Sequence, residues 1–355
     1  MVSRVIDQFL KLVAIDSPSG REEALLCYLI EQLKILDLTY IQDSFGNIFA
    51  WVNCDDAPSI TFACHIDTVG NAIGVKPVID EQYIRTDGTT ALGADDKIAV
   101  ALALILAQEK RRYGPFGLLF TVQEEVGLQG AKHLGPEILS QLNTVFVFDT
   151  GRPLGTVVVQ APWKLDVKIA FHGKAAHAGV APELGTCAIS LASKAISQMK
   201  LLRVDEMTTA NIGSIHGCGS TNVVCDLVTT HLEIRSLVRQ RAFDHLDHIR
   251  QCCQAACSEG GGSFSLEEEV SYDGYRVEAS DALVLFQQAC TACNIPYTEL
   301  SSGGGSDVNI LRTHIKDAIL LGVGYERAHS IEERISIQEI EKLVRVADQM
   351  LCLVQ

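Results

Sequence analysis

Histidine and acidic residues lie at the ends of several apolar segments of the chain. The set comprises His65 and Asp67 after 59–64, Asp95 and Asp96 before 97–110, Glu124 and Glu125 after 117–122, Asp149 after 144–148, and His329 after 318–323. Each position has an ordinary explanation by itself, such as a solvated strand end or a helix N-cap. In an open α/β sheet, however, a site lies beyond the carboxyl ends of the strands. Several segments that each deliver His, Asp or Glu to that edge form a ligand set that suits zinc, and a shared carboxylate suits two ions.

Two short spacings within this set indicate a division of roles. Residues i and i+2 of a strand face the same side, so Asp67 can hydrogen-bond the far ring nitrogen of a metal-binding His65. The adjacent Glu124 and Glu125 can act separately, one as a metal ligand and the other as the group that moves protons.

The elements that must position these residues are short and apolar. Runs at 48–52, 59–64, 117–122 and 144–148 alternate with a helical pattern at 97–110. Nearly continuous apolar strands that alternate with helices predict an α/β fold, with a largely parallel sheet covered by helices on both faces. Upstream, Ser19 and Glu22 fit a capping box that opens a helix through about Leu33.

From Trp163 the pattern changes to alternating polar and apolar residues, which is typical of half-exposed antiparallel strands. Strands are predicted at 163–171, 209–214, 221–237 and 263–271, and helices at 185–201 and 243–259. This indicates an inserted α+β domain, a four-stranded sheet with two helices on one face. A helix at 281–293, a strand at 318–323 and a helix at 337–353 follow. With 355 residues the chain is long enough for two domains, and we expect a catalytic domain at 1–162 and 273–355 and the insert at 163–272.

Composition excludes several classes of function. A formal charge of −15 without clustered Lys or Arg argues against nucleic acid as a partner. No apolar stretch is long enough for a membrane span, and the first residues lack the pattern of a secretory signal. The 12 cysteines are scattered, as buried free thiols are in a reducing compartment, and Cys290-x-x-Cys293 has no second pair. These features predict a cytoplasmic protein without a membrane partner.

Taken together, the residues resemble the di-zinc hydrolases of the peptidase T and carboxypeptidase G family, in the right order and over essentially the whole chain. The motifs are His65-x-Asp67, Gly93-x-Asp95-Asp96-Lys97, Glu124-Glu125, Asp149, His329 and, in the insert, Gly173–Gly179 followed by Pro182–Gly185. The segment Thr121–Ala131 also looks like the tetrahedral aminopeptidases, which carry their second domain between His-x-Asp and Asp-Asp. Residues 68–94 are too few for a domain, which favours the peptidase T arrangement.

This resemblance implies a zinc-exopeptidase fold with two Zn²⁺ per chain, for which Co²⁺ or Mn²⁺ would substitute in vitro. The implied metal ligands are His65 and Asp149 for one ion, Glu125 and His329 for the other, and Asp95 as the bridge. Glu124 would be the general base, with Asp67 as a supporting catalytic residue, and the Asp95–Asp96 peptide bond would be cis. The implied substrate contacts are His177, Asn222, Arg235, Gly304 and Gly305. The insert would pair two chains into a homodimer and place His177 in the partner's active site.

The resemblance also indicates a function. A peptidase T-like protein removes the N-terminal residue of tripeptides, and the stretch from Glu124 to Leu128 favours this reading, with a short peptide as substrate. A carboxypeptidase or an N-acyl amino acid deacylase would use the same catalytic residues. A peptide-binding protein on a decayed hydrolase fold is the non-enzyme alternative, but every ligand position and the base position is filled.

Overall fold

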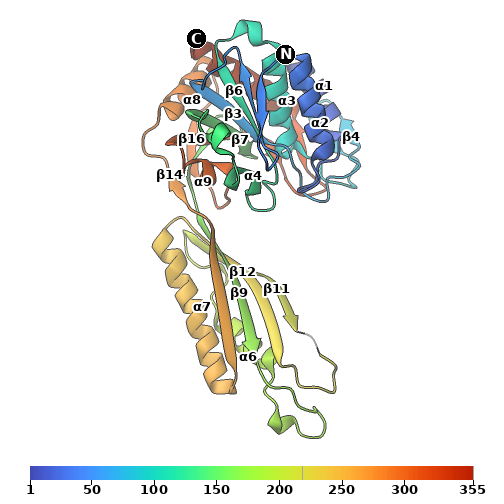
Figure 1. Ribbon diagram of the computed structural model, residues 1–355, viewed down its shortest axis with the longest axis vertical. Coiled ribbons are helices and arrows are strands. Elements are labelled where there is room, and N and C mark those ends of the chain that lie inside the picture. Colours follow the sequence, from blue (N-terminus) through green and yellow to red (C-terminus); the bar gives the residue numbers. More distant parts are fainter. Residues whose placement is uncertain (218, 355) are drawn as a thin grey trace. The chain divides into compact units, whose positions relative to one another are not determined.

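The computed structural model describes residues 1–217 and 219–354, which form two compact units (Figure 1). The first unit contains Met1–Val159, Arg276–Ser301 and Ser306–Gln355, and the second contains Gln160–Tyr275 and Ser302–Gly305. The insert expected from the sequence covers 163–272, whereas the second unit of the structure also contains Ser302–Gly305.

A mixed sheet forms the centre of the first unit. Its strands are β1 (Tyr40–Gln42), β2 (Ile48–Val52), β3 (Ile60–His65), β6 (Phe116–Thr121), β7 (Thr144–Thr150), β8 (Thr156–Ala161), β14 (Tyr275–Arg276), β15 (Thr298–Ser301) and β16 (Asp317–Gly322). Strand β3 pairs in parallel with β6 and β7, and β7 pairs in parallel with β16. Antiparallel strands β2 and β8 flank this parallel centre. Every residue of β2, β3 and β6 is buried, as their continuous apolar runs predict. The predicted, largely parallel sheet is confirmed.

Helices flank this sheet (Figure 1). They are α1 (Val2–Val13), α2 (Glu23–Ile35), α3 (Ala94–Gln108), α4 (Gln129–Lys132), α5 (Pro136–Leu139), α8 (Asp281–Ala292), α9 (Asp307–Leu311) and α10 (Ile337–Leu353), with a 3₁₀ turn at Lys110–Arg112. Helix α3 packs on β3 and β7 and is buried over almost its whole length, because apolar residues cover all of its faces. Within the described ranges, none of the helices is long and apolar enough to cross a membrane.

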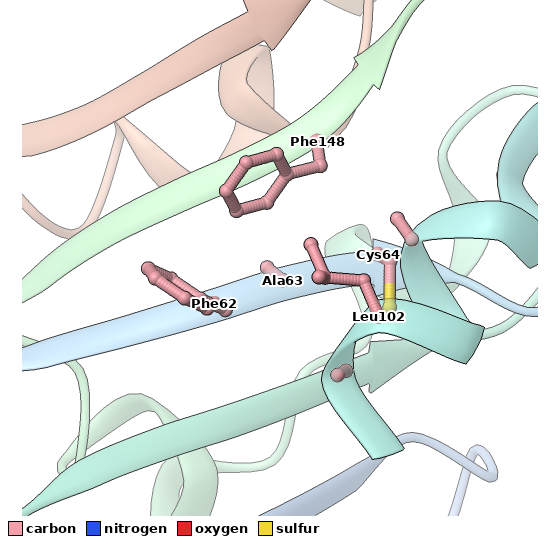
Figure 2. A pocket seen from close by; sticks show the side chains of 7 residues that line it. Phe62, Ala63, Cys64, Leu102 and Phe148 are labelled. Atoms are coloured by element: carbon pink, nitrogen blue, oxygen red, sulfur yellow. The ribbon is translucent and has the colours of Figure 1, made fainter. Parts of the chain in front are cut away.

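The contact between α3 and the sheet leaves one small apolar gap. Its lining includes Phe62, Cys64, Leu102 and Phe148, and Figure 2 shows these side chains around it. The rings of Phe62 and Phe148 meet edge to face at a centroid separation of 5.1 Å. The gap has no room for a water molecule, so it is part of the core packing and offers no ligand site.

A second, smaller antiparallel sheet lies in the first unit. It contains β17 (Tyr325–Glu326), β18 (Arg334–Ser336), β5 (Tyr83–Thr86) and β4 (Pro77–Ile79), in that order. The sequence does not predict this sheet, because strands of two to four residues are too short to display a periodic pattern. The sheet pairs β18 with β5, Ile335 opposite Ile84, and so fixes the loop that carries His329.

The predicted capping box at Ser19 and Glu22 was wrong. Helix α2 begins at Glu23 with Glu22 as N-cap, and no side chain caps it. Glu22 instead accepts a hydrogen bond from the Gly20 amide at 2.8 Å, while the Ser19 hydroxyl donates to Asp67 at 2.6 Å. A tertiary contact therefore takes the hydroxyl that the local pattern had assigned to the helix.

The second unit is an antiparallel sheet covered by two helices. Its strands are β9 (Trp163–His172), β10 (Leu202–Arg203), β11 (Thr208–Gly217), β12 (Leu227–Ser236) and β13 (Ser263–Tyr272), and its helices are α6 (Ala188–Gln198) and α7 (Arg239–Gly260), with a 3₁₀ turn at Pro182–Leu184. The described strands follow the order β10-β11-β12-β9-β13, so the predicted four-stranded sheet gains a fifth strand. That strand, β10, has two exposed residues that pair with Thr209 and Ala210, too few to leave a sequence signal.

The core of the second unit lies between this sheet and its helices. Helices α6 and α7 contact each other and both contact β9 and β12, so they cover the same face. Alternate residues of β9, among them Leu165, Val167 and Ile169, are buried beneath them. Two expected segments are shorter than predicted: 221–237 is a strand only over Leu227–Ser236, and 185–201 is a helix only over Ala188–Gln198.

Candidate metal centre and active site

Three parallel strands deliver the first site residues to one edge of the central sheet. His65 is the last residue of β3 and lies opposite Thr121, the last residue of β6. Glu124 and Glu125 follow β6 in a turn, and Asp149 lies near the end of the neighbouring β7. Because these strands are adjacent and parallel, side chains that are far apart in the sequence converge.

Asp95 lies between the two histidines. Its Oδ1 is 3.1 Å from His65 Nε2, and its Oδ2 is 3.2 Å from His329 Nε2. Asp149 Oδ1 lies 3.6 Å from the same nitrogen of His65, and Glu125 Oε1 lies 2.9 Å from that of His329. The five residues thus form two halves that share one carboxylate, with His65 and Asp149 on one side and Glu125 and His329 on the other.

These distances fit two metal ions. Zinc bonds to nitrogen and oxygen of about 2.0–2.1 Å at a tetrahedral angle place two ligands about 3.3 Å apart. His65, Asp95 and Glu125 also offer one ligand atom each within 4.8 Å of one another. Glu125 Oε1 is buried without a hydrogen bond of good geometry although His329 lies 2.9 Å away, as expected for two ligands that point at a common ion. The donor set, nitrogen and carboxylate oxygen, is one that zinc accepts.

The Asp95 backbone also agrees with what the resemblance implied. Helix α3 is assigned from Ala94, but Asp95 and Asp96 have non-helical dihedral angles, and the peptide bond between them is cis. Neither aspartate is the N-cap of the helix, since that position is Gly93.

Asp67 connects His65 with the turn that carries both glutamates. Its carboxylate accepts hydrogen bonds from the Glu124 amide at 2.9 Å, the Glu125 amide at 3.2 Å and the Ser19 hydroxyl. His65 Nδ1 lies 3.4 Å from Asp67 Oδ1 and 3.0 Å from the Asp67 carbonyl oxygen. The expected contact with His65 is present. Strand β3 ends at His65, so Asp67 lies just beyond the strand.

The charges of the site shift the pKa values of its members. Desolvation by the surrounding protein, followed by the repulsion of Asp149, raises the pKa of Glu124 well above its usual range. Desolvation also raises the pKa of Asp149 to about 7. Hydrogen bonds to Asp95 and Glu125 raise the pKa of His329 to about 10. Burial opposes the effect of the two histidines on Asp95, whose pKa nevertheless falls well below its usual value. The raised pKa values show that the crowded, buried carboxylates resist carrying several negative charges without a cation, and a bound metal ion would relieve this repulsion.

Sequence reasoning missed several residues that contact the site. The Tyr325 hydroxyl donates to Asp149 Oδ1 at 3.3 Å, and Glu333 accepts hydrogen bonds from the turn that contains Asp95. The Thr121 hydroxyl donates to Asp307 Oδ2 at 2.6 Å, and burial raises the pKa of Asp307 to about 6. Tyr325 follows an apolar run and carried a weak signal, whereas Glu333 stands in a charged run that is typical of solvated surface.

The remaining predicted residues lie in the second unit. His177 and Val223 form an isolated antiparallel β-bridge between their backbones. His177 Nδ1 accepts a hydrogen bond from the Gly179 amide at 3.2 Å. Asn222 is exposed, and its carbonyl accepts from the Ala178 amide, so it lies beside the His177 loop. The Arg235 guanidinium, in contrast, donates two hydrogen bonds to the Glu233 carboxylate. Arg235 Nε lies 2.8 Å from Glu233 Oε1, and Arg235 Nη2 lies 3.0 Å from Glu233 Oε2. A substrate carboxylate would have to compete with Glu233 for this guanidinium.

The predicted glycine contacts lie in a segment of the same unit. The Gly304 amide donates to the Ser302 hydroxyl at 3.0 Å. A Cβ on Gly305 would come within 2.4 Å of the Tyr272 ring, so close packing excludes a side chain there. This contact, together with the hydrogen bond from the Ser302 amide to the Gln160 carbonyl, explains why 302–305 groups with the insert.

Known proteins with a similar sequence or structure include peptidases. The sequence pattern of peptidase family M20/M25/M40 matches residues 61–352. An uncharacterized protein, YqjE of Bacillus subtilis, is 36% identical, with 99% of this chain and 98% of that protein covered. The crystal structure of a tripeptidase from Staphylococcus aureus superimposes with a TM-score of 0.92 at 35% identity, over 100% and 98% of the two chains. That of the aminopeptidase PepT from Bacillus cereus superimposes with a TM-score of 0.86 at 33% identity, over 99% and 98%.

Proposed function

The chain belongs to peptidase family M20/M25/M40, and from that premise we propose that it is a zinc-dependent tripeptide aminopeptidase. The observation that carries the proposal is the position of Asp95, whose two oxygens face His65 and His329 at 3.1 and 3.2 Å. In the proposed site His65 and Asp149 would hold one Zn²⁺ and Glu125 and His329 the other, with Asp95 as the shared ligand. The likeness to a tripeptidase and to an aminopeptidase supports removal of the N-terminal residue from a short peptide.

In this proposal the metal ions, when bound, polarise the scissile carbonyl and bring the pKa of a water molecule towards neutrality. Glu124 would accept a proton from the water as the water oxygen bonds to the scissile carbonyl carbon, and would return it to the amine nitrogen as the C–N bond breaks. The contact of the Glu124 amide with Asp67 fixes the backbone from which this side chain reaches the water. Tyr325 keeps the Asp149 carboxylate in one orientation through its hydroxyl.

We further propose that the second unit pairs two chains and that His177 donates a hydrogen bond to the substrate carbonyl oxygen in the partner's site. Strand β11 supports such pairing. It pairs with β12 along its length, but β10 covers only Thr209 and Ala210 on its other side among the described residues. Ile215, Val223 and Leu227 expose apolar side chains in this unit, as an interface between copies would. His177 in an exposed loop is open to such a role.

A carboxypeptidase or an N-acyl amino acid deacylase would use the same catalytic groups, so the scissile bond needs its own test. Purified, zinc-loaded protein should be incubated separately with tripeptides, dipeptides and N-acyl amino acids, and the first bond to break read by mass spectrometry. Fastest release of the N-terminal residue from tripeptides is expected. Faster deacylation would instead identify an N-acyl amino acid deacylase, and release from the carboxyl end would identify a carboxypeptidase.

The free thiols of the described cysteines are consistent with the cytoplasmic location that we propose.

A further inference from the structure

A buried glutamate holds the backbone on which Asp95 stands. The Glu333 carboxylate is almost fully buried and accepts hydrogen bonds from three amides of one short turn. Oε2 accepts from Leu92 at 2.9 Å and from Gly93 at 3.1 Å, and Oε1 accepts from Asp95 at 3.2 Å. The neighbouring Glu332 is exposed and pairs with Arg327. Two adjacent glutamates thus have entirely different surroundings.

Burial of a carboxylate is costly unless hydrogen bonds replace the lost water. Here three amides do so. Burial raises the pKa of Glu333 to about 7, and hydrogen bonds to its ionised form are roughly twice as strong as neutral ones. They also satisfy backbone groups that the unusual turn before α3 leaves without a helical partner. The arrangement leaves Asp95 few alternatives to the observed orientation.

Glu333 also connects the two ends of the site. It lies four positions after His329 in the sequence, so a single side chain joins the loop of one histidine to the turn of the shared aspartate. A second contact holds the His329 loop, because the His329 carbonyl oxygen accepts a hydrogen bond from the Asn71 side-chain amide at 3.2 Å. Asp95 faces both histidines, so a displacement of its turn would disturb both halves of the site.

We propose that Glu333 is the positioning residue of the metal site. It acts through the Asp95 turn and by that route sets the affinity for both ions. The inference rests on the proposed function in so far as the site binds metal. It differs from the effect of losing a ligand such as Glu125, which would weaken one ion only. Partners that orient metal ligands typically contribute 10–100-fold to metal affinity.

The test compares Glu333→Gln with Glu332→Gln, its exposed neighbour. Glutamine keeps the size and one acceptor oxygen of Glu333 but loses the second oxygen and the charge. Zinc dissociation constants should be measured by competition with a chelator, and hydrogen exchange of the amides of 92–95 should be measured in metal-free protein. For Glu333→Gln we expect both ions to bind about 10–100-fold more weakly and the turn amides to exchange faster. Glu332→Gln should match the parent in both measurements.

Parent-like affinity for both ions in folded Glu333→Gln would overturn the proposal, as would an equal loss in Glu332→Gln. If Glu333→Gln does not fold, Glu333→Asp serves instead, because it keeps the charge and retracts the carboxylate by one methylene. Weaker binding of both ions is then expected, and unchanged binding contradicts the proposal. The exchange measurement needs no peptide cleavage, so failure of the parent to cleave peptides would count against the proposed function and not against Glu333.

Discussion

Asp67 accepts a hydrogen bond from the backbone amide of Glu124 at 2.9 Å, and this contact joins the strand that ends in His65 to the turn that carries the proposed base. The same carboxylate accepts from the Glu125 amide. One buried aspartate therefore contacts a proposed metal ligand, the turn of the proposed base and the turn of a second proposed ligand. Its role extends beyond the support of His65 that the sequence suggested.

Substitutions of the two neighbouring glutamates should have different effects. Glu124→Gln is expected to keep its metal and lose about 10²–10⁴-fold in kcat, because general acid–base transfer supplies gains of that size. Glu125→Gln should instead weaken one of the two ions. Steady-state kinetics together with elemental analysis of each variant makes the comparison. Near-normal kcat in metal-loaded Glu124→Gln would mean that the base is misassigned.

Metal removal should destabilise the protein in a pH-dependent manner. A ligand that binds only the folded state stabilises it by about 2.7 kcal/mol at a hundred times its dissociation constant, so a chelator should lower Tm and zinc should restore it. In metal-free protein the pKa of His329 is raised to about 10, so the ring is protonated at neutral pH and must lose this proton to bind metal. Zinc affinity should therefore rise between about pH 6 and about pH 8. Calorimetry in buffers of several pH values measures the Tm and the zinc affinity. A zinc affinity that falls between about pH 6 and about pH 8 would contradict the assignment of His329 as a metal ligand.

Two buried threonines on adjacent strands allow a matched comparison of how a hydroxyl contributes to the free energy of unfolding. The Thr121 hydroxyl donates to Asp307, whereas the Thr61 hydroxyl has no hydrogen-bond partner within the described residues. Thr121→Val would leave a buried carboxylate without its donor and should cost about 1–3 kcal/mol in the free energy of unfolding. Thr61→Val removes an unsatisfied hydroxyl and should be neutral or stabilising. Urea unfolding measures the difference, and equal effects of the two changes would refute the argument.

The sequence predicted the site residues that directly follow long apolar runs. The apolar runs before His65, Glu124 and Asp149 are long enough to identify strands, and the order of motifs placed their ends together. It could not predict Glu333 or the hydroxyl of Ser19, because both act through contacts with residues far away in the chain. Ser19 even matched a local capping pattern that a bond to Asp67 overrides. Short strands such as β18 left no periodicity to detect.

The proposed contribution of His177 to the partner's site can be tested by mixing two inactive variants. Glu124→Gln and His177→Ala should be combined under conditions in which subunits exchange. In a mixed dimer one site would contain an intact Glu124 and an intact His177 from the opposite chain, and the other would lack both. Random pairing makes about half of the dimers mixed, so activity should return to about a quarter of the wild-type value. A mixture that stays inactive despite proven exchange, or a monomer in light scattering, would remove the assignment.

The central claim is that two metal ions and Glu124 release the N-terminal residue of a tripeptide. The most direct measurement is a time course of product formation, by mass spectrometry, from a tripeptide with three residues of different mass. Zinc-loaded protein should release the first residue and leave the dipeptide of the other two, a chelator should stop the reaction, and added zinc should restore it. Release of the third residue first, cleavage that a chelator does not affect, or no cleavage by protein that carries two ions per chain would contradict the claim.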